Sequence, residues 1–469
     1  MATPSKDACL GNIAADRAPI ISHSLAQGID FEEVQSFLAT LPENRYPAAA
    51  YARRGRMPCV QPRGGYPRFE SQLALTHELD RAGADFIPLT IDSYTRHNQY
   101  DTAARLLQRS EDEEKDYLNG YPLINHGYEV TRELYRGLDK PVSLRHGTPD
   151  ARLLVEVAIA SGIVEIEGGG ICYCIPYSEG FPLDRALLYW QHVDRVCALY
   201  STADRPIHRE SFGPLSATLV PPTTAITIQI IEALLAAEQG VCSFTVSFGQ
   251  TGSISQDIAT ARVLRQLARE FLDRFGFNAT AVYLAYHQWM GQFPHNRAKA
   301  AGLIAGGTLV SSLINADKIV VKTVDEALGI PKAEVNSEAV DTVKYLLRTF
   351  SFATPPNSPE IQAEAELIES EVRHILEAVF AMPGRAFWES VYQAFRMGYI
   401  DVPFSPHADN ANRLLSMRDA RGSIRIINPG ALPISAEDLR REQQMLSVDS
   451  VSRGEGYRQL LADINIMLD

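Results

Sequence analysis

Short apolar runs alternate with longer amphipathic stretches along most of the chain from Pro58 onward. The short runs are rich in Val, Ile and Phe, a pattern typical of parallel strands joined by crossover helices. The expected strands are Pro58–Gln61, Phe86–Thr90, Val142–Arg145, Val164–Glu167, Pro206–Arg209, Phe244–Phe248, Ala281–His287 and Lys318–Lys322. This repeated alternation predicts an α/β fold, a TIM (β/α)8 barrel. A doubly wound open sheet is the main alternative, because one misread strand would change the count.

Amphipathic helices are predicted between these strands. Thr148-Pro149 should begin one helix, and Gly162 should end it just before the next strand. The other predicted helices are Ser71–Ala82, Thr224–Glu238, Ile258–Phe275 and Asn296–Ile304.

Two segments without this alternation flank the predicted barrel, which we place at residues 52–357. Residues 1–51 are predicted to form an N-terminal arm with a helix near Phe31–Leu41. In residues 358–469, Ser358-Pro359 should begin a long helix whose apolar face packs on another element. The remainder is predicted to be an appended α+β extension.

Charge and composition narrow the possible partners. The chain has 469 residues and a formal net charge of −13, so its surface should repel nucleic acid and anionic membranes. Six cysteines in so long a chain, with no basic and apolar leader, predict free thiols in a reducing cytoplasm. The longest apolar stretch, Gly302–Ile314, is too short to span a bilayer.

Arginines follow the first three predicted strands. Arg63 and Arg96 lie in the segments after the first and second strands, and Arg145 ends the third. Active sites of TIM barrels lie at these strand ends, and arginine binds carboxylates with two parallel hydrogen bonds. Any one of these arginines could simply form a surface ion pair. Together they predict a site for a small dicarboxylic acid.

Glu167 ends the fourth predicted strand and is followed by Gly168–Gly170. Its carboxylate could hold an ammonium group, act as a base, or only balance the arginines. The glycines lack the context of a phosphate-binding loop, so we expect them to permit close packing against a ligand.

Two further features carry weaker signals. His287 ends the seventh predicted strand and could be either a core residue or a site residue. Cys172 and Cys174 lie close together but lack the second ligand pair that a zinc site needs, so no metal site is predicted.

Several strings of residues resemble the large (epsilon) subunit of glutamate mutase, also called methylaspartate mutase. The similarity runs from Arg63 to Ile330 and continues into Met417–Asp419. The strings are Arg145–Asp150, Glu167–Gly170, Phe212–Leu215, Thr218–Pro222, His287–Gly291 and Val321–Thr323.

This resemblance implies an isomerase that interconverts L-glutamate and threo-3-methyl-L-aspartate by a radical carbon-skeleton rearrangement. It also implies adenosylcobalamin (coenzyme B12), held mainly by a separate small (sigma) subunit. The DxHxxG cobalt-ligand motif of that subunit is missing from this chain, which alone should be inactive. Two large and two small subunits would form a heterotetramer.

The resemblance also assigns roles to individual residues. It implies that Glu167 contacts the substrate amino group and can take its proton. Residues matching the substrate-binding positions are Arg63, Arg96, Arg145, His146, Glu167, Tyr173 and Tyr177. Residues matching the cofactor-binding positions are Gly65, Asn119, Pro176, Phe293, Lys322, Glu326 and Ile330, with Lys322 and Glu326 near the substrate and the adenosyl ribose.

The chain departs from the family pattern at Cys172, Cys174 and His97, which we expect to line or neighbour the pocket. A B12-dependent mutase for another amino dicarboxylate is therefore an alternative. A TIM-barrel lyase that uses Lys322 as a Schiff-base amine is another, and a non-catalytic scaffold is a third.

Overall fold

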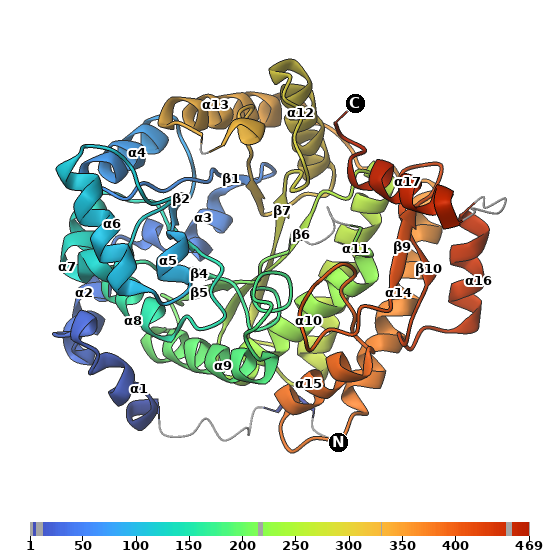
Figure 1. Ribbon diagram of the computed structural model, residues 1–469, viewed down its shortest axis with the longest axis horizontal. Coiled ribbons are helices and arrows are strands. Elements are labelled where there is room, and N and C mark those ends of the chain that lie inside the picture. Colours follow the sequence, from blue (N-terminus) through green and yellow to red (C-terminus); the bar gives the residue numbers. More distant parts are fainter. Residues whose placement is uncertain (1–2, 6–12, 214–218, 330, 447–452, 469) are drawn as a thin grey trace.

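The computed structural model describes residues 3–5, 13–213, 219–329, 331–446 and 453–468. Eight parallel strands form its centre, which confirms the predicted TIM barrel (Figure 1). The strands are β1 (Cys59–Gln61), β2 (Ile87–Thr90), β3 (Val142–Arg145), β4 (Glu165–Glu167), β5 (His208–Glu210), β6 (Ser243–Gly249), β7 (Ala281–His287) and β8 (Lys318–Val320).

Backbone hydrogen bonds close the sheet into a ring. Each strand from β2 to β7 pairs with the strand that follows it in the chain, and β8 pairs with β1. Between β1 and β2, the carbonyl oxygen of Val60 accepts from the N–H groups of Asp85 (2.9 Å) and Phe86 (3.3 Å). The N–H of Thr90 donates to the carbonyl oxygen of Gly64 (3.0 Å). The sheet is therefore not an open, doubly wound one.

Helices surround the barrel, as the apolar spacing predicts. They are α4 (Phe69–Arg81), α6 (Tyr100–Asp112), α7 (Leu123–Leu134), α8 (Arg152–Ala160), α9 (Leu183–Tyr200), α10 (Pro222–Glu238), α11 (Ile254–Arg274), α12 (Arg297–Leu313) and α13 (Ala333–Phe350). Within the described residues, none of the helices is long and apolar enough to cross a membrane.

Several predicted helix boundaries differ from the structure. α11 begins at Ile254, four residues before the predicted Ile258. α8 begins at Arg152, because the Thr148 hydroxyl accepts from the N–H of Asp150 (3.2 Å) in a local turn and does not cap a helix there. α12 continues past Ile304 to Leu313. Its Gly307 packs against Gln250 so closely that an added Cβ would lie 2.8 Å from the amide oxygen. Gly307 therefore serves helix packing, and the helix continues past it.

The N-terminal arm contains α1 (Ile13–Ile21), α2 (Phe31–Thr40) and α3 (Pro47–Arg53). The last of these helices closes the end of the barrel at which the strands begin. The Tyr51 ring stacks on Tyr283 with centroids 4.3 Å apart, and its hydroxyl lies 3.2 Å from the Thr245 hydroxyl. Together with Phe86, these side chains fill the bottom of the barrel.

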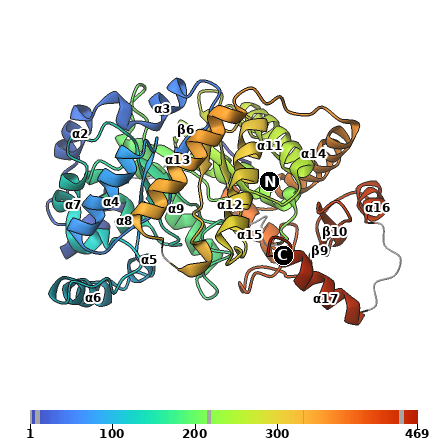
Figure 2. The same ribbon diagram turned by 90° about the horizontal axis from the view of Figure 1, so that it is seen from above.

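The C-terminal region begins with α14 (Pro359–Phe380), capped by Ser358 as predicted. This helix packs on α10 and α11, and α10 is consequently buried along its whole length. The remaining elements are α15 (Phe387–Met397), the antiparallel hairpin β9 (Leu415–Arg418) and β10 (Ile424–Asn428), α16 (Ala436–Met445) and α17 (Arg453–Ile464). Figure 2 shows the hairpin, α16 and α17 at one side of the barrel, so the extension does combine helix and strand.

Candidate active site

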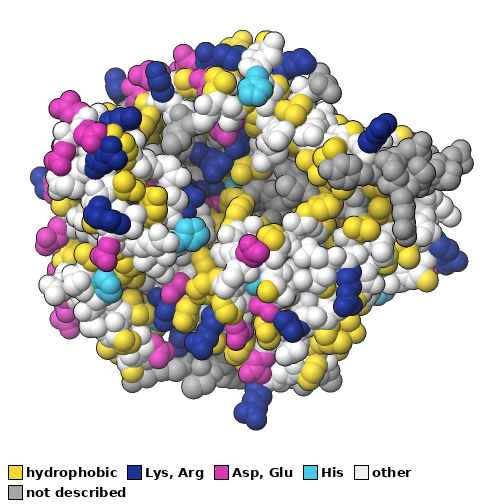
Figure 3. All heavy atoms as spheres, viewed as in Figure 1, with side chains coloured by type: hydrophobic (Ala, Val, Ile, Leu, Met, Phe, Trp, Pro, Cys, Tyr) yellow, Lys and Arg dark blue, Asp and Glu magenta, His cyan; other side chains and the backbone are white. Residues whose placement is uncertain are grey.

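The predicted site residues lie at the mouth of the barrel, where the strands end. The space-filling view shows a hollow at the centre of this face, with Lys and Arg side chains inside it (Figure 3). Arg145 is the last residue of β3, and Glu167 is the last residue of β4. Arg96 ends the short helix α5 (Ser93–Arg96), which Asp92 caps through the N–H groups of Tyr94 and Thr95.

Arg145 is fully engaged by carboxylates. Its Nη2 lies 2.6 Å from Glu167 Oε1, and its Nη1 donates to Glu210 Oε1 at 2.8 Å. All three side chains are buried. The two carboxylates are neighbours because Glu167 and Glu210 are paired in the β4–β5 register. The guanidinium therefore bridges adjacent strands.

A second buried cation lies beneath Arg145. Lys318 at the start of β8 forms ion pairs with both Glu165 and Glu210. Barrel interiors are usually filled with branched apolar residues. Here the layer below the mouth is ionic, and each charge has an opposite charge in contact, which is the condition for burying it.

These contacts set the ionisation of the carboxyl groups. Burial would raise the pKa of Glu210, but Lys318 and Arg145 hold that pKa far below its usual range. Burial raises the pKa of Glu167 to about 6, although Arg145 opposes the shift. Burial likewise raises the pKa of Glu165 to about 7. Glu167 can therefore change protonation near neutral pH.

Arg63 and Arg96 are bound less tightly than Arg145. Arg96 Nε donates to the Ile91 carbonyl oxygen at 2.6 Å, and Arg63 Nη1 lies 3.8 Å from the sulfur of Met290. Neither forms an ion pair with a carboxylate in the part of the chain that the structure describes. Burial, together with the charge of Arg63, lowers the pKa of Arg96. Among the described residues, these two guanidinium groups thus have no carboxylate in direct contact.

Aromatic rings form one wall of the site. Tyr173 is buried and donates its hydroxyl hydrogen to Glu167 Oε2. His146 stacks on Trp190 with centroids 5.7 Å apart and meets the edge of Tyr173 at 4.9 Å. Burial and the nearby charge of Arg96 lower the pKa of His146, which is therefore neutral. Tyr177 lies farther out, with 51% of its surface exposed.

The glycines after Glu167 pack against protein groups, which corrects the prediction that they approach a ligand. A Cβ on Gly168 would lie 2.4 Å from the Tyr173 ring, and one on Gly169 would lie 2.3 Å from the Glu232 carboxylate. Glu232 Oε1 in turn accepts from the N–H groups of Ile171 (2.8 Å) and Cys172 (3.1 Å). The glycines therefore fix the loop that carries Tyr173.

The residues that depart from the family pattern have different surroundings. The thiol of Cys174 lies 3.3 Å from the Phe181 carbonyl oxygen and 3.2 Å from His407 Nε2, so it contacts the C-terminal region. Cys172 is buried with its sulfur 3.7 Å from the Ser211 hydroxyl. His97 is exposed at the end of α5.

The predicted cofactor-binding residues that the structure describes lie in the loops after the strands. Lys322 Nζ lies 2.6 Å from Glu326 Oε2 and 5.8 Å from the Phe293 ring centroid. Phe293 and Glu326 line a cavity of about 340 Å³. Burial and the charge of Arg63 lower the pKa of Lys322 to about 8.

The other predicted cofactor-binding residues differ from one another in how far they are buried. Asn119 is exposed and accepts from the N–H of Ser93 (2.8 Å), and Pro176 is half-buried. Gly65 is buried against the Thr90 carbonyl oxygen, which would lie 2.3 Å from an added Cβ. Ile330 lies outside the described residues, as do positions 214–215 and 218 of the family-like strings.

Sequence reasoning missed Glu210 and Lys318 as site residues. The predicted fifth strand ended at Arg209, one residue before Glu210. The available signal was the run of charged residues from His208 to Glu210 inside an expected buried strand. Such charges require partners in the barrel interior.

One group of possible metal ligands occurs among the described residues. Ligand atoms of Glu167, Glu210 and His287 lie within 4.8 Å of one another. Arg145 already pairs with both of these carboxylates, so their charges are balanced without an ion.

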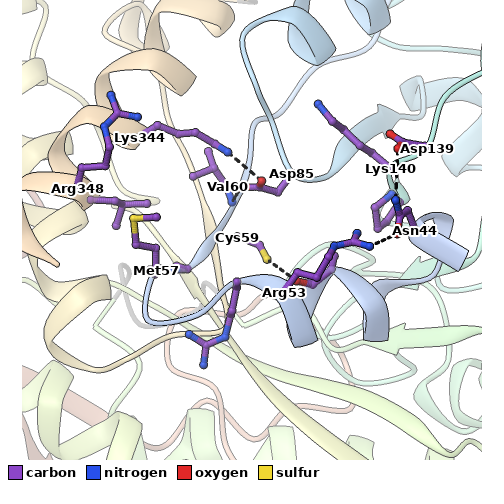
Figure 4. Close-up of a pocket in the computed structure, with 15 residues that line it drawn as sticks. Asn44, Arg53, Met57, Cys59, Val60, Asp85, Asp139, Lys140, Lys344 and Arg348 are labelled. Carbon is purple, nitrogen blue, oxygen red and sulfur yellow. Dashed lines mark hydrogen bonds and ion pairs between the residues drawn. The ribbon is translucent and has the colours of Figure 1, made fainter.

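A cavity of about 440 Å³ lies at the opposite end of the barrel, near the strand starts (Figure 4). Its rim carries Arg53, Lys140 and Arg348, and Asp85 on its wall accepts from Lys344 at 2.8 Å. In TIM barrels this end serves stability, and the chemistry takes place at the strand ends.

The fold and these side chains define a TIM-barrel protein with arginines and buried carboxylates gathered at its mouth. A sequence model of the family described as methylaspartate mutase E chain (MutE) matches residues 42–468. The chain belongs to this family of mutases, as its motifs predicted.

Curated relatives agree with the family assignment. The glutamate mutase epsilon subunit of Desulfitobacterium hafniense is 38% identical over 442 residues, which cover 93% of this chain and 91% of the relative. The protein of the same name from Halobacterium salinarum is 38% identical over 444 residues, which cover 94% of this chain and 92% of that relative. Among solved structures, tryptophan synthase subunit alpha from Legionella pneumophila matches with a TM-score of 0.36 and 13% identity, covering 65% of this chain and 99% of that one.

Replacing Lys318 with Met should destabilise the protein by about 3–5 kcal/mol, because Glu165 and Glu210 would then face each other in the barrel without a cation. The midpoint of urea unfolding measures this effect. The double variant Lys318→Met/Glu165→Leu should recover much of the loss, and Lys332→Met on an exposed position is the matched control. A Lys318→Met variant as stable as the wild type would contradict the ion-pair account.

Proposed function

We propose that this chain is the catalytic large subunit of an adenosylcobalamin-dependent glutamate mutase that interconverts L-glutamate and threo-3-methyl-L-aspartate. The observation that carries the proposal is the group of Arg63, Arg96 and Arg145 around a buried glutamate, Glu167. An amino dicarboxylic acid has two carboxylates and one ammonium group. The arginines would bind the carboxylates, and Glu167 would bind the ammonium group. Family membership supplies the reaction class.

Substrate binding would exchange one ion pair. In the structure, Arg145 contacts both Glu167 and Glu210. A substrate carboxylate would replace Glu167 on Arg145, while the substrate ammonium group would bind the released carboxylate of Glu167. Glu210 would keep its hydrogen bond to Arg145 and hold the guanidinium in place. Arg63 and Arg96 would complete the binding of the two carboxylates.

Glu167 is suited to hold or take a proton from the substrate amino group. Its raised pKa of about 6 brings it closer to the range in which a carboxylate acts as a base at neutral pH. Tyr173 donates a hydrogen bond to Glu167 Oε2 and fixes the orientation of the carboxylate.

The mouth of the barrel would face a large cofactor held by another chain. Lys322, Glu326 and Phe293 form one group beside a cavity of about 340 Å³, and both charged groups offer hydrogen bonds to ribose hydroxyls. Adenosylcobalamin would supply the radical that starts the rearrangement. The residues of this chain would bind the substrate beneath it, orient it and exclude water.

The partner would be a small cobalamin-binding subunit, and we place the pair in a heterotetramer of two large and two small subunits. The name epsilon subunit of the relatives supports a multi-subunit assembly. The cysteines within the described residues are free thiols, which fits our placement of the protein in the cytoplasm.

The direct test combines this chain with a small cobalamin-binding subunit, adenosylcobalamin and L-glutamate. We expect formation of methylaspartate and the absorbance of cob(II)alamin, neither of which should arise without the small subunit. The small subunit should first be shown to form an active enzyme with a known epsilon subunit. If the same small subunit then gives no product with this chain, the proposal is overturned.

In the same assay, Arg145→Lys should reduce kcat/KM by roughly 30-fold or more, because an ammonium group cannot replace the two charge-assisted hydrogen bonds of a guanidinium. Cobalamin binding should change little. Arg348→Lys, an exposed arginine at the other end of the barrel, is the control and should be fully active. Full activity of Arg145→Lys would contradict its role in carboxylate binding.

The kcat/KM for glutamate should rise with pH through about 6 and fall through about 8. Below the lower value Glu167 is protonated and loses the charge that binds the ammonium group. Above the higher value Lys322 loses its proton and its positive charge. Glu167→Gln should remove the acidic limb and leave the alkaline limb. An unchanged acidic limb in that variant would exclude Glu167 as its source.

A further inference from the structure

His287 is a buried polar residue without a hydrogen-bond partner among the described residues. It ends β7, and only 1% of its surface is exposed. Neither ring nitrogen forms a hydrogen bond with a described residue. An unsatisfied buried polar group costs about 1–3 kcal/mol, so a partner supplied by a ligand would stabilise it.

The other histidines of the barrel differ in this respect. His208 lies lower in the barrel, with its two ring nitrogens 2.8 Å from the Ser243 hydroxyl and 2.7 Å from the Thr245 hydroxyl. His146 accepts from the N–H of Thr148 at 3.3 Å. The Nε2 of His146 also lacks a hydrogen-bond partner among the described residues, so His287 is the one of these three histidines with neither ring nitrogen paired.

The surroundings of His287 indicate the kind of group it would meet. A ring nitrogen lies within 4.8 Å of carboxylate oxygens of Glu167 and Glu210. The edge-to-face contact with Phe212, at 5.5 Å between centroids, fixes the orientation of the ring. Arg145 balances these carboxylates in the structure. Once a substrate carboxylate takes the place of Glu167 on Arg145, the released Glu167 carboxylate would attract the substrate ammonium group to the side of this ring.

His287 is also held in its neutral form. Burial, with the positive charges of Arg145, Arg63 and Lys318 nearby, lowers its pKa well below the usual value, although Glu210 opposes the shift. A neutral imidazole keeps one nitrogen with a free lone pair, which can accept a hydrogen bond from an N–H group.

We propose that His287 contacts the substrate as a neutral acceptor for its ammonium group, beside Glu167, and thereby selects amino dicarboxylates over dicarboxylates without an amino group. This inference rests on the proposed function and deepens it. Glu167 supplies the charge that attracts the ammonium group, and His287 supplies a second, directional acceptor. A ligand without the amino group leaves this acceptor unused.

The test compares two ligands in the complex reconstituted with the small subunit and adenosylcobalamin. Glutamate affinity is followed as KM and by calorimetry, and glutarate, which lacks the amino group, is measured as a competitive inhibitor. His287→Leu should weaken glutamate binding about 10-fold or more and change glutarate binding less than about twofold. His287→Gln, which keeps an acceptor oxygen, should restore part of the glutamate affinity.

His208→Gln is the matched control, because it alters a buried neutral histidine whose nitrogens already have partners. It should affect both ligands equally. Equal weakening of glutamate and glutarate in both His287 variants would overturn the inference. A wild-type complex that does not convert glutamate would instead overturn the proposed function, so the two failures are distinct.

Discussion

The pairing of buried charges inside the barrel is the constraint on which the site depends. Arg145 and Lys318 lie among Glu165, Glu167 and Glu210, and each charge contacts an opposite one. Removing one partner from such a network leaves a buried charge unbalanced, at a cost of several kcal/mol. The barrel can bury these side chains only as a set, and the set fixes the orientation of Arg145 at the mouth.

The two carboxylates that contact Arg145 differ in how firmly they are held. Glu210 is held from below by Lys318, so its contact with Arg145 belongs to the framework. Glu167 is held by Tyr173 and by Arg145, and its raised pKa shows that the environment stabilises the anion only in part. In the proposed function, the ammonium group of an amino dicarboxylate would replace Arg145 as the partner of Glu167. Arg63 and Arg96 would bind the carboxylates.

The barrel and its mouth could be predicted from sequence because they follow from regular signals. The alternating apolar runs predicted the eight strands. The polar residues at the strand ends predicted that Arg145 and Glu167 lie at the mouth. Lys318 and Glu210 could not be assigned in this way, because their role comes from contacts between strands far apart in the chain. Gly168 and Gly169 were misread because a glycine signals close packing but not which group it packs against.

A crystal structure of the reconstituted complex with bound L-glutamate tests the central claim most directly. The account predicts that a substrate carboxylate occupies Arg145 Nη2, that the substrate ammonium group lies within hydrogen-bond distance of Glu167, and that Arg145 keeps its bond to Glu210. A structure in which Arg145 and Glu167 remain paired while glutamate binds elsewhere at the mouth would contradict it.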